Sequence, residues 1–282
     1  MTFSIVACDL QADPAPEWGV AVASKFLAVG SCVGFGRAGA GAVATQALAN
    51  VAYGPQGLDL LSSGSSAQEV VESLTRADDG RDDRQLGVVD REGRAATFTG
   101  RGCFDWAGGL VSDGYCCQGN ILTGSGVIAE MSRAFDSARG ELAERLLVAL
   151  AAGDAAGGDR RGRQSAALLV VREGGGYGGG NDVAVDLRVD DHPAPIPELQ
   201  RIFGIHRLLM PRPEDLRLID VDASLAAELR TLLQLPPGTT YDDDVKAALR
   251  EFIGSENLEE RWVDQDRLEQ GILDHLRNKS RG

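Results

Sequence analysis

The order of apolar patterns along the chain constrains its fold more than any other feature. Strand-like and helix-like segments come in blocks, with two or four strands followed by two helices. Strand patterns occupy 3–7, 18–24, 31–35, 40–45, 85–90, 95–99, 164–172 and 183–189, and helix pairs are expected over 57–74 and 120–149. Strand–helix–strand crossovers are few, which excludes a Rossmann-type parallel sheet. The order favours an α+β fold, a four-layer αββα sandwich in which two antiparallel sheets lie between two helix pairs.

Glycine content and charge divide the chain near Pro211 and Pro213. Residues 213–282 hold only four of the 36 glycines, and their 16 acidic and 9 basic residues give −7 of the total charge of −14. Two prolines so close together interrupt any helix. Leucine-rich stripes at helical spacing follow within the tail. We therefore expect one domain at 1–205 and a small helical bundle at 213–282.

Composition excludes several classes of partner. The net charge of −14 argues against nucleic acid or an anionic membrane. No apolar stretch reaches the ~18 residues of a membrane-spanning helix, and residues 1–14 lack the basic region of an export signal. The five cysteines are an odd number without a Cys-x-x-Cys pair, which fits a reduced, cytoplasmic protein without structural zinc. Helical layers of αββα sandwiches often pair, so a homo-oligomer is expected.

Several spaced motifs carry a resemblance to a known family. In chain order they are MTFSIVA at 1–7, GVAVAS at 19–24, ATQA at 44–47, Asn50, YGP at 53–55, FTG at 98–100, WAG at 106–108, QGN at 118–120, GGDR at 157–160 and DLRVDDH at 186–192. Over about 2–200 the chain resembles domain of unknown function 1028, whose members have the fold of N-terminal nucleophile (Ntn) hydrolases. The tail, with NLEERW at 257–262, resembles the peptidoglycan-binding domain often appended to this family.

Thr2 is the strongest candidate for catalysis. Methionine aminopeptidase generally removes Met1 when the next side chain is small, which would leave a hydroxyl and a free α-amine on Thr2. The amine titrates near ~8, so its neutral form can take the hydroxyl proton. Ntn hydrolases cleave amides in this way through a covalent acyl-enzyme. The alternative is that Thr2 merely begins a strand.

The resemblance also points to Lys25, which is the only lysine before residue 213. In proteasome-like relatives of the fold, a lysine on a neighbouring strand keeps the α-amine neutral by its charge. A hairpin that turns near Pro14 would bring Lys25 close to Thr2, and Asp9 would orient the lysine. The alternative is a solvated lysine at the end of a strand.

Further polar residues are expected to line the site. Ser4 shares a strand face with Thr2 because strand side chains alternate, and Ser24 is a second wall residue; each is otherwise a structural hydroxyl. Gln46, Asn50 and Tyr53 follow the fourth strand as candidate amide or hydroxyl donors to an oxyanion, or else as polar groups that close a loop. Gln118 and Asn120 show a similar pattern, although Asn120 is otherwise the N-cap of a helix.

No metal site is expected. Asp190, Asp191 and His192 form the one cluster with metal-ligand side chains, but consecutive strand residues face opposite ways. Two functions remain open. The first is an Ntn hydrolase that acts on a small-molecule amide without metal or organic cofactor. The second is a catalytically silent binding or assembly module whose tail engages a protein partner or a peptidoglycan fragment.

Overall fold

The computed structural model describes residues 2–280. The chain divides into two compact units, Met1–Arg201 and Ile202–Gly282. The fold is mixed α/β, and every strand pair in the described part is antiparallel. Within residues 2–280, no helix combines the length and the apolar character needed to cross a bilayer.

The larger sheet of the first unit has the strand order β10-β9-β2-β1-β8-β7. Its strands are β1 (Thr2–Asp9), β2 (Glu17–Ser24), β7 (Gly108–Ser112), β8 (Tyr115–Asn120), β9 (Ser165–Arg172) and β10 (Val183–Val189). The central strand β1 pairs with β2 on one side and β8 on the other, so Phe3 lies opposite Ala23 and Thr2 opposite Asn120. This register places Thr2, at the start of β1, beside the last residues of β2.

The smaller sheet has the order β3-β4-β5-β6. Its strands are β3 (Gly34–Arg37), β4 (Gly41–Ala47), β5 (Arg84–Asp90) and β6 (Ala95–Thr99), and helices α1 (Tyr53–Ser62) and α2 (Ala67–Arg76) pack on it. Ser66 starts α2 with a capping box in which its hydroxyl accepts from the Glu69 backbone, as polar caps do. One core cluster joins this helix pair to the sheet through Val43 and Leu86.

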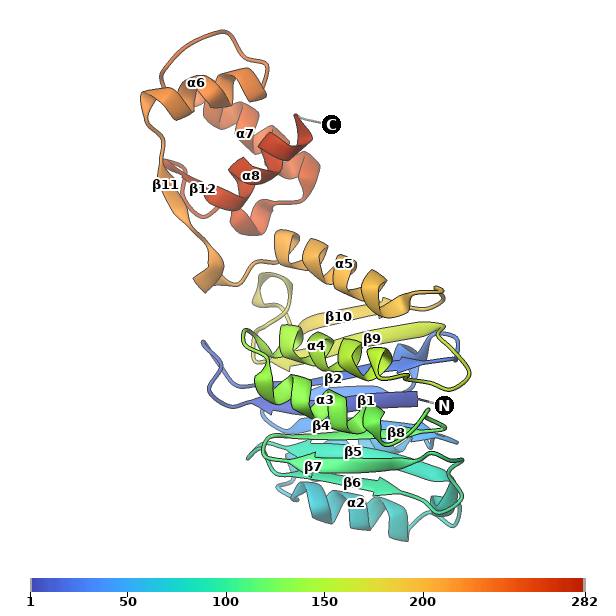
Figure 1. Ribbon diagram of the computed structural model, residues 1–282. Coiled ribbons are helices and arrows are strands. Elements are labelled where there is room, and N and C mark those ends of the chain that lie inside the picture. The colour runs from blue at the N-terminus through green and yellow to red at the C-terminus, as the bar shows by residue number, and fades with distance from the viewer. Residues whose placement is uncertain (1, 281–282) are drawn as a thin grey trace. The chain divides into compact units, whose positions relative to one another are not determined.

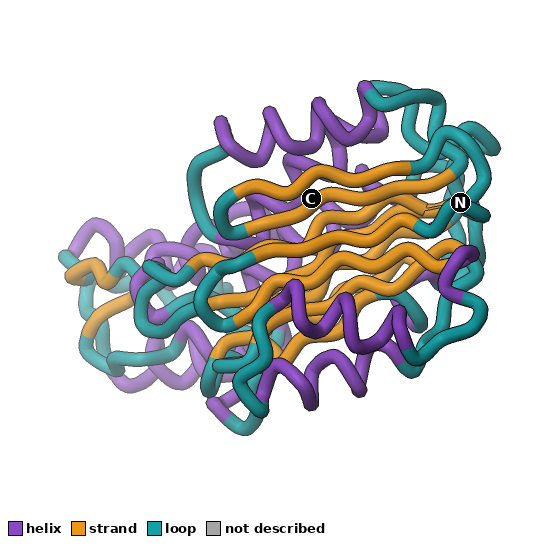
Figure 2. Tube along the Cα trace, turned by 90° about the horizontal axis from the view of Figure 1, so that it is seen from below, coloured by secondary structure: helices purple, strands orange, loops and turns teal. Residues whose placement is uncertain are grey.

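The two sheets share an apolar core because residues alternate across each strand. Even-numbered residues of β1, such as Val6 and Cys8, cluster with Val20 of β2, Ala44 of β4 and Val89 of β5. The other face of the larger sheet packs against α3 (Gly126–Ser137) and α4 (Leu142–Ala155), as Figure 1 shows. Figure 2 shows the strands of the first unit running side by side, with helices outside them.

The second unit is mostly helical. Its elements are β11 (Leu218–Asp220), α6 (Ala223–Leu232), α7 (Asp243–Glu256), β12 (Arg267–Glu269) and α8 (Gln270–Lys279). Leu229, Leu249, Leu268 and Ile272 belong to its buried core. Helix α5 (Pro195–Leu209) spans the division between the units. The three amphipathic helices expected in the tail are present, and the β11–β12 pair is an addition to them.

The structure differs from the sequence expectations in two elements, and the first of them contributes to the site. The helix expected to begin at Asn120 begins instead at Gly126, and residues 108–120 form the hairpin of β7 and β8. Asn120 therefore ends a buried strand and is not a helix N-cap. Helix α5 was also not expected, because Pro195 and Pro197 obscure its start; proline is tolerated in the first turn of a helix.

Candidate functional site

Thr2 lines a cavity at one end of the two sheets. It begins β1, is 6% exposed, and its Oγ1 lies 3.2 Å from Oγ of Ser24, the last residue of β2. Thr2, Ser24 and Gln46 are among the residues that line a cavity of about 430 Å³. Three of the residues expected at the site are thus brought together by β1, β2 and β4.

The rest of the cavity wall comes from two segments. One follows β2 and the other starts at Ala47, the last residue of β4, and Arg84 at the start of β5 completes the wall. The full lining is Thr2, Ser24, Phe26, Val29, Cys32, Val33, Gln46, Ala47, Leu48, Ala49, Val51 and Arg84. Ala47 has a left-handed φ of 71°, a conformation that costs energy for a residue with a Cβ. Backbone strain of this kind concentrates at functional sites, so the turn after β4 supports the assignment of the site.

A buried polar cluster lies behind Thr2. Ser4 Oγ donates to Gln46 Oε1 (2.7 Å) and accepts from Gln118 Nε2 (2.6 Å). Gln46 Nε2 in turn donates to the Thr2 carbonyl oxygen (3.4 Å). Ser4 therefore faces the space between the two sheets, but it positions other groups and does not line the cavity.

Gln85 is the centre of this cluster. Its Oε1 accepts from Gln46 Nε2 (2.8 Å) and Asn120 Nδ2 (3.0 Å), and its Nε2 donates to Gly119 O (2.7 Å) and Thr99 Oγ1 (2.9 Å). These bonds tie β4 and β6 of the smaller sheet, through β5, to β8 of the larger sheet. Gln85 is fully buried, and buried amides need such partners.

Gln46 is less suited to oxyanion binding than expected. Its Nε2 already faces three acceptors: Gln85 Oε1, the Thr2 carbonyl oxygen and the Gln118 carbonyl oxygen. An amide carries only two N–H bonds, so this group is saturated by the protein itself. Gln46 therefore holds the backbone of Thr2, and the cavity's backbone amides become the better candidate donors.

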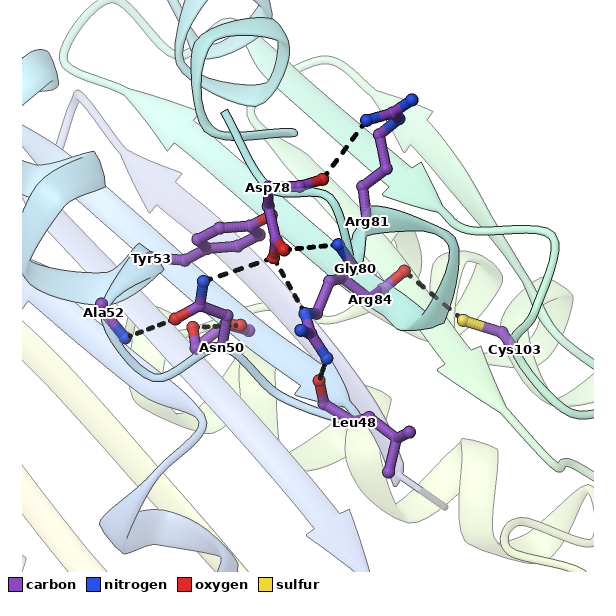
Figure 3. Close-up of polar contacts among 10 residues, drawn as sticks. Leu48, Asn50, Ala52, Tyr53, Asp78, Gly80, Arg81, Arg84 and Cys103 are labelled. Atoms are coloured by element: carbon purple, nitrogen blue, oxygen red, sulfur yellow. Dashed lines mark hydrogen bonds and ion pairs between the residues drawn. The ribbon is translucent and has the colours of Figure 1, made fainter. Parts of the chain in front are cut away.

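Asn50 and Tyr53 do not face Thr2. Tyr53 Oη (2.9 Å) and Asn50 Nδ2 (3.3 Å) both donate to Asp78 Oδ2, which also accepts from Arg84 Nε (2.9 Å). Figure 3 shows these groups converging on Asp78. Arg84 lowers the pKa of this carboxyl, and burial raises the pKa of Tyr53. The expectation that Asn50 and Tyr53 donate to an oxyanion is thus corrected, because Asp78 engages both.

The Asp78 cluster shapes the cavity from outside. Arg84 Nη1 donates to the carbonyl oxygen of Leu48 (2.5 Å), which links Asp78 to the turn after β4 (Figure 3). Asn50 Oδ1 also accepts from the Ala52 backbone amide (3.2 Å). These bonds hold the segment 47–52 in place, and part of that segment forms the cavity wall.

Lys25 and Asp9 are not brought to the site. Lys25 follows the end of β2, is exposed, and does not line the cavity; its backbone amide donates to Asp159 Oδ2 (2.8 Å). Asp9 lies opposite Glu17 at the turn of the hairpin and forms an ion pair with Arg145. At ~3.3 Å per residue, the length of β1 separates Asp9 from Thr2 by about 23 Å, so Asp9 does not orient Lys25.

Metal-ligating clusters are not found in the part of the chain that is described: no group of three His, Cys, Asp or Glu side chains converges there. His192 Nδ1 accepts from the Ala194 backbone amide (3.0 Å). The five cysteines are free thiols. Burial raises the pKa of Cys8 and of Cys116 to about 12, so neither thiol suits nucleophilic catalysis.

Sequence reasoning missed Cys32, Gln85 and Arg84. Cys32 and Arg84 line the cavity, and Gln85 organises the polar cluster behind it. A glutamine in the strand 85–90 on the face opposite Leu86 was the available signal for a polar position between the sheets. No signal in the sequence pairs Arg84 with Asp78.

Comparison with known proteins finds relatives for most of the first unit. The sequence model described as "Family of unknown function (DUF1028)" matches residues 2–199. A crystal structure from Silicibacter pomeroyi that carries the same family model is 34% identical with a TM-score of 0.66, covering 73% of this chain and 86% of that chain. Anbu (ancestral beta-subunit) from Yersinia bercovieri is 13% identical with a TM-score of 0.31, covering 75% of this chain and 98% of that chain. No curated protein matches the sequence.

Proposed function

The chain belongs to the DUF1028 family, a family of unknown function, and from this premise we propose that it is an Ntn hydrolase that cleaves a C–N amide bond. The observation that carries the proposal is the position of Thr2. This residue begins the central strand of a sheet and lines a cavity of about 430 Å³, and its hydroxyl contacts that of Ser24. Two sheets that share a core and carry helix pairs support a four-layer αββα sandwich of the Ntn type.

The reaction would proceed through an acyl-enzyme. Met1 lies outside the described residues, and its removal makes the α-amine of Thr2 the general base. The amine takes the hydroxyl proton as Oγ1 attacks the amide carbon, so a C–O bond forms. The C–N bond then breaks as the leaving amine takes that proton. Water attacks the resulting ester, releases the carboxylic acid and restores the hydroxyl. These steps need neither a metal nor an organic cofactor.

The geometry changes the roles expected for neighbouring residues. Ser24 Oγ lies 3.2 Å from Thr2 Oγ1 and would orient this hydroxyl, but it carries no charge and does not replace the cation proposed for Lys25. The developing oxyanion needs donors that are fixed before reaction. The backbone amide of Ala47 is our candidate, because this residue lines the cavity in a strained conformation next to Gln46.

A threonine-to-valine substitution tests the nucleophile. Thr2→Val keeps the side-chain shape and a small second residue, so removal of Met1 is retained while the hydroxyl is lost. We expect complete loss of acylation by amide-reactive probes. Thr97→Val is the matched control, since the Thr97 hydroxyl also lies in the first unit but donates to Leu86 O away from the cavity.

Intact mass and N-terminal sequencing of the native protein accompany this test. A chain that begins at Thr2 and forms a Thr2 ester with an amide probe supports the proposal. A retained Met1, or probe labelling that survives Thr2→Val, contradicts it and favours a catalytically silent binding module instead.

For the second unit we propose a binding role. A cavity of about 770 Å³ lies among α6, α7 and α8, with Leu233, Phe252 and Leu276 in its wall beside Glu251 and Lys279. This mixed apolar and charged lining suits a peptidoglycan fragment or a protein segment. Titration with a soluble muropeptide tests the first choice: binding that Phe252→Ala weakens supports it, and the absence of heat or chemical-shift change contradicts it.

A further inference from the structure

Most of the residues that line the cavity beside Thr2 have apolar side chains. Of the twelve lining residues, eight carry apolar or thiol side chains. Val29 and Val33 form the buried floor, whereas Phe26, Leu48 and Val51 are 55%, 61% and 45% exposed. Exposed apolar side chains that surround one cavity are typical of a binding site for an apolar ligand.

The single charged lining residue, Arg84, is already neutralised. Its Nε donates to Asp78 Oδ2 and its Nη1 to the Leu48 carbonyl oxygen. Its Nη2 lies against the backbone of Gly80, where an added Cβ would approach it to 2.5 Å. The lining side chains therefore offer no uncompensated charge to a ligand, and a buried ionic group on the alkyl chain would lose its hydration without gaining a side-chain partner.

The polar groups of the cavity are confined to one place. Thr2, Ser24 and Gln46 are the polar uncharged lining residues, and the bonds among Thr2, Ser24 and Gln46 keep them at the ends of β1, β2 and β4. A ligand with one polar function and an apolar remainder matches this distribution. The polar function would lie at Thr2, and the remainder would extend over Val29 and Val33 toward Phe26.

We infer that the substrate is a carboxamide whose acyl group is an uncharged, medium-length alkyl chain, and that this cavity binds the acyl side of the scissile bond. The inference rests on the proposed function for the reaction at Thr2, but it concerns the affinity of the cavity, which is measurable without turnover. Each methylene that enters the cavity is expected to strengthen binding about fourfold.

Cys32 provides a probe of occupancy. It lines the cavity and is half-buried, and Cys103, outside the cavity lining, is also half-buried; burial raises the pKa of both thiols. In the full-length Thr2→Val protein at pH 9, the rates of modification of both cysteines by methyl methanethiosulfonate would be followed by peptide mass spectrometry. Acetamide, butanamide and hexanamide are the neutral ligands, and succinamate and 4-aminobutanamide are the charged ones.

The expected result is selective protection of Cys32. The concentration for half-protection should fall about fourfold per methylene from acetamide to hexanamide, with Cys103 unaffected. Equal protection by the charged amides, an absence of chain-length dependence, or equal protection of Cys103 would overturn the inference. Selective protection of Cys32 in the Thr2→Val protein, combined with a wild-type protein that forms no Thr2 ester with an amide probe, would support the inference while refuting the proposed function.

A second pair of variants tests the location. Ala49 lines the cavity and Ala52, in the same turn, is exposed and outside the lining. Ala49→Phe should abolish the advantage of hexanamide over butanamide, because the larger ring fills the space for the longer chain. Ala52→Phe should leave that advantage unchanged. If both variants behave alike, the alkyl chain does not lie in this cavity.

Discussion

Replacing Gln85 with methionine should destabilise the first unit far more than the same replacement at Gln118. Both side chains are buried between the sheets, and methionine has a similar length without polar atoms. Gln85 satisfies polar groups on three neighbouring strands, β4, β6 and β8. The Oε1 of Gln118, in contrast, accepts no hydrogen bond from residues 2–280.

The expected magnitudes follow from which partners are left behind. Gln85→Met removes the partner of Asn120 Nδ2 and the short bond to Gly119 O, and each orphaned buried group costs ~1–3 kcal/mol. Burial of the methionine offsets ~1 kcal/mol, which leaves a loss of about 3 kcal/mol. Gln118→Met loses the bond to Ser4 but also removes an unsatisfied oxygen, so its cost should stay below about 1 kcal/mol.

Urea unfolding followed by tryptophan fluorescence measures both changes. Trp262 belongs to the second unit, so a Trp262→Phe background restricts the signal to Trp18 and Trp106 of the first unit and avoids mixing two transitions. Gln68→Met, on the exposed face of α2, is the control and should cost less than about 0.5 kcal/mol. A larger loss for Gln118→Met than for Gln85→Met would refute the role assigned to Gln85.

Three further predictions concern charge, thiols and assembly. Arg84 lowers the pKa of Asp78 in the folded chain. Ionised Asp78 therefore stabilises the fold above its unfolded pKa near ~4, and this stabilisation is lost as the pH falls further. In Asp78→Asn, the urea concentration at the midpoint of unfolding should fall less steeply as the pH is lowered. The pKa of about 12 for Cys8 and for Cys116 predicts that, at pH 8, neither reacts with Ellman's reagent in the native protein, whereas both react in urea. The homo-oligomer expected from the helical layers would be contradicted by a single-chain mass in light scattering.

Most strands of the first unit were predictable because their apolar and β-branched residues follow a two-residue period. The predicted segments 95–99 and 183–189 coincide with β6 and β10. The hairpin of β7 and β8 was missed for a physical reason: Gln118 and Asn120 face polar partners between the sheets, where strands usually carry apolar residues. When buried positions are assumed to be apolar, the polar Gln118 and Asn120 indicate an exposed segment, and a helix is then expected to begin at Asn120.

The site was predictable where it depends on strand alternation and not where it depends on tertiary contacts. Alternation placed Thr2 and Ser4 on one face, and Ser24, predicted only as a wall residue, contacts Thr2. Lys25 follows Ser24 just after β2 ends, where strand alternation no longer sets the direction of a side chain, and it is exposed and outside the cavity lining. Tyr53 was misassigned because its partner, Asp78, follows a helix 25 residues later, and no local pattern encodes that contact.

The change of chemistry along the sheet interface explains why a costly polar cluster lies beside Thr2. At the Cys8 end of β1, the sheets meet through apolar side chains that tolerate small shifts. At the other end, Ser4 donates to Gln46 Oε1, and Gln46 Nε2 donates back to the Thr2 carbonyl oxygen. This pair of bonds couples β1 to β4 by directed contacts, which constrain distance and angle more tightly than apolar packing does. If Thr2 is the nucleophile that we propose, it must be held to within ~0.5 Å of its reacting position. The cluster therefore fixes Thr2 against the cavity wall at the point where apolar packing alone would leave the strand free to shift.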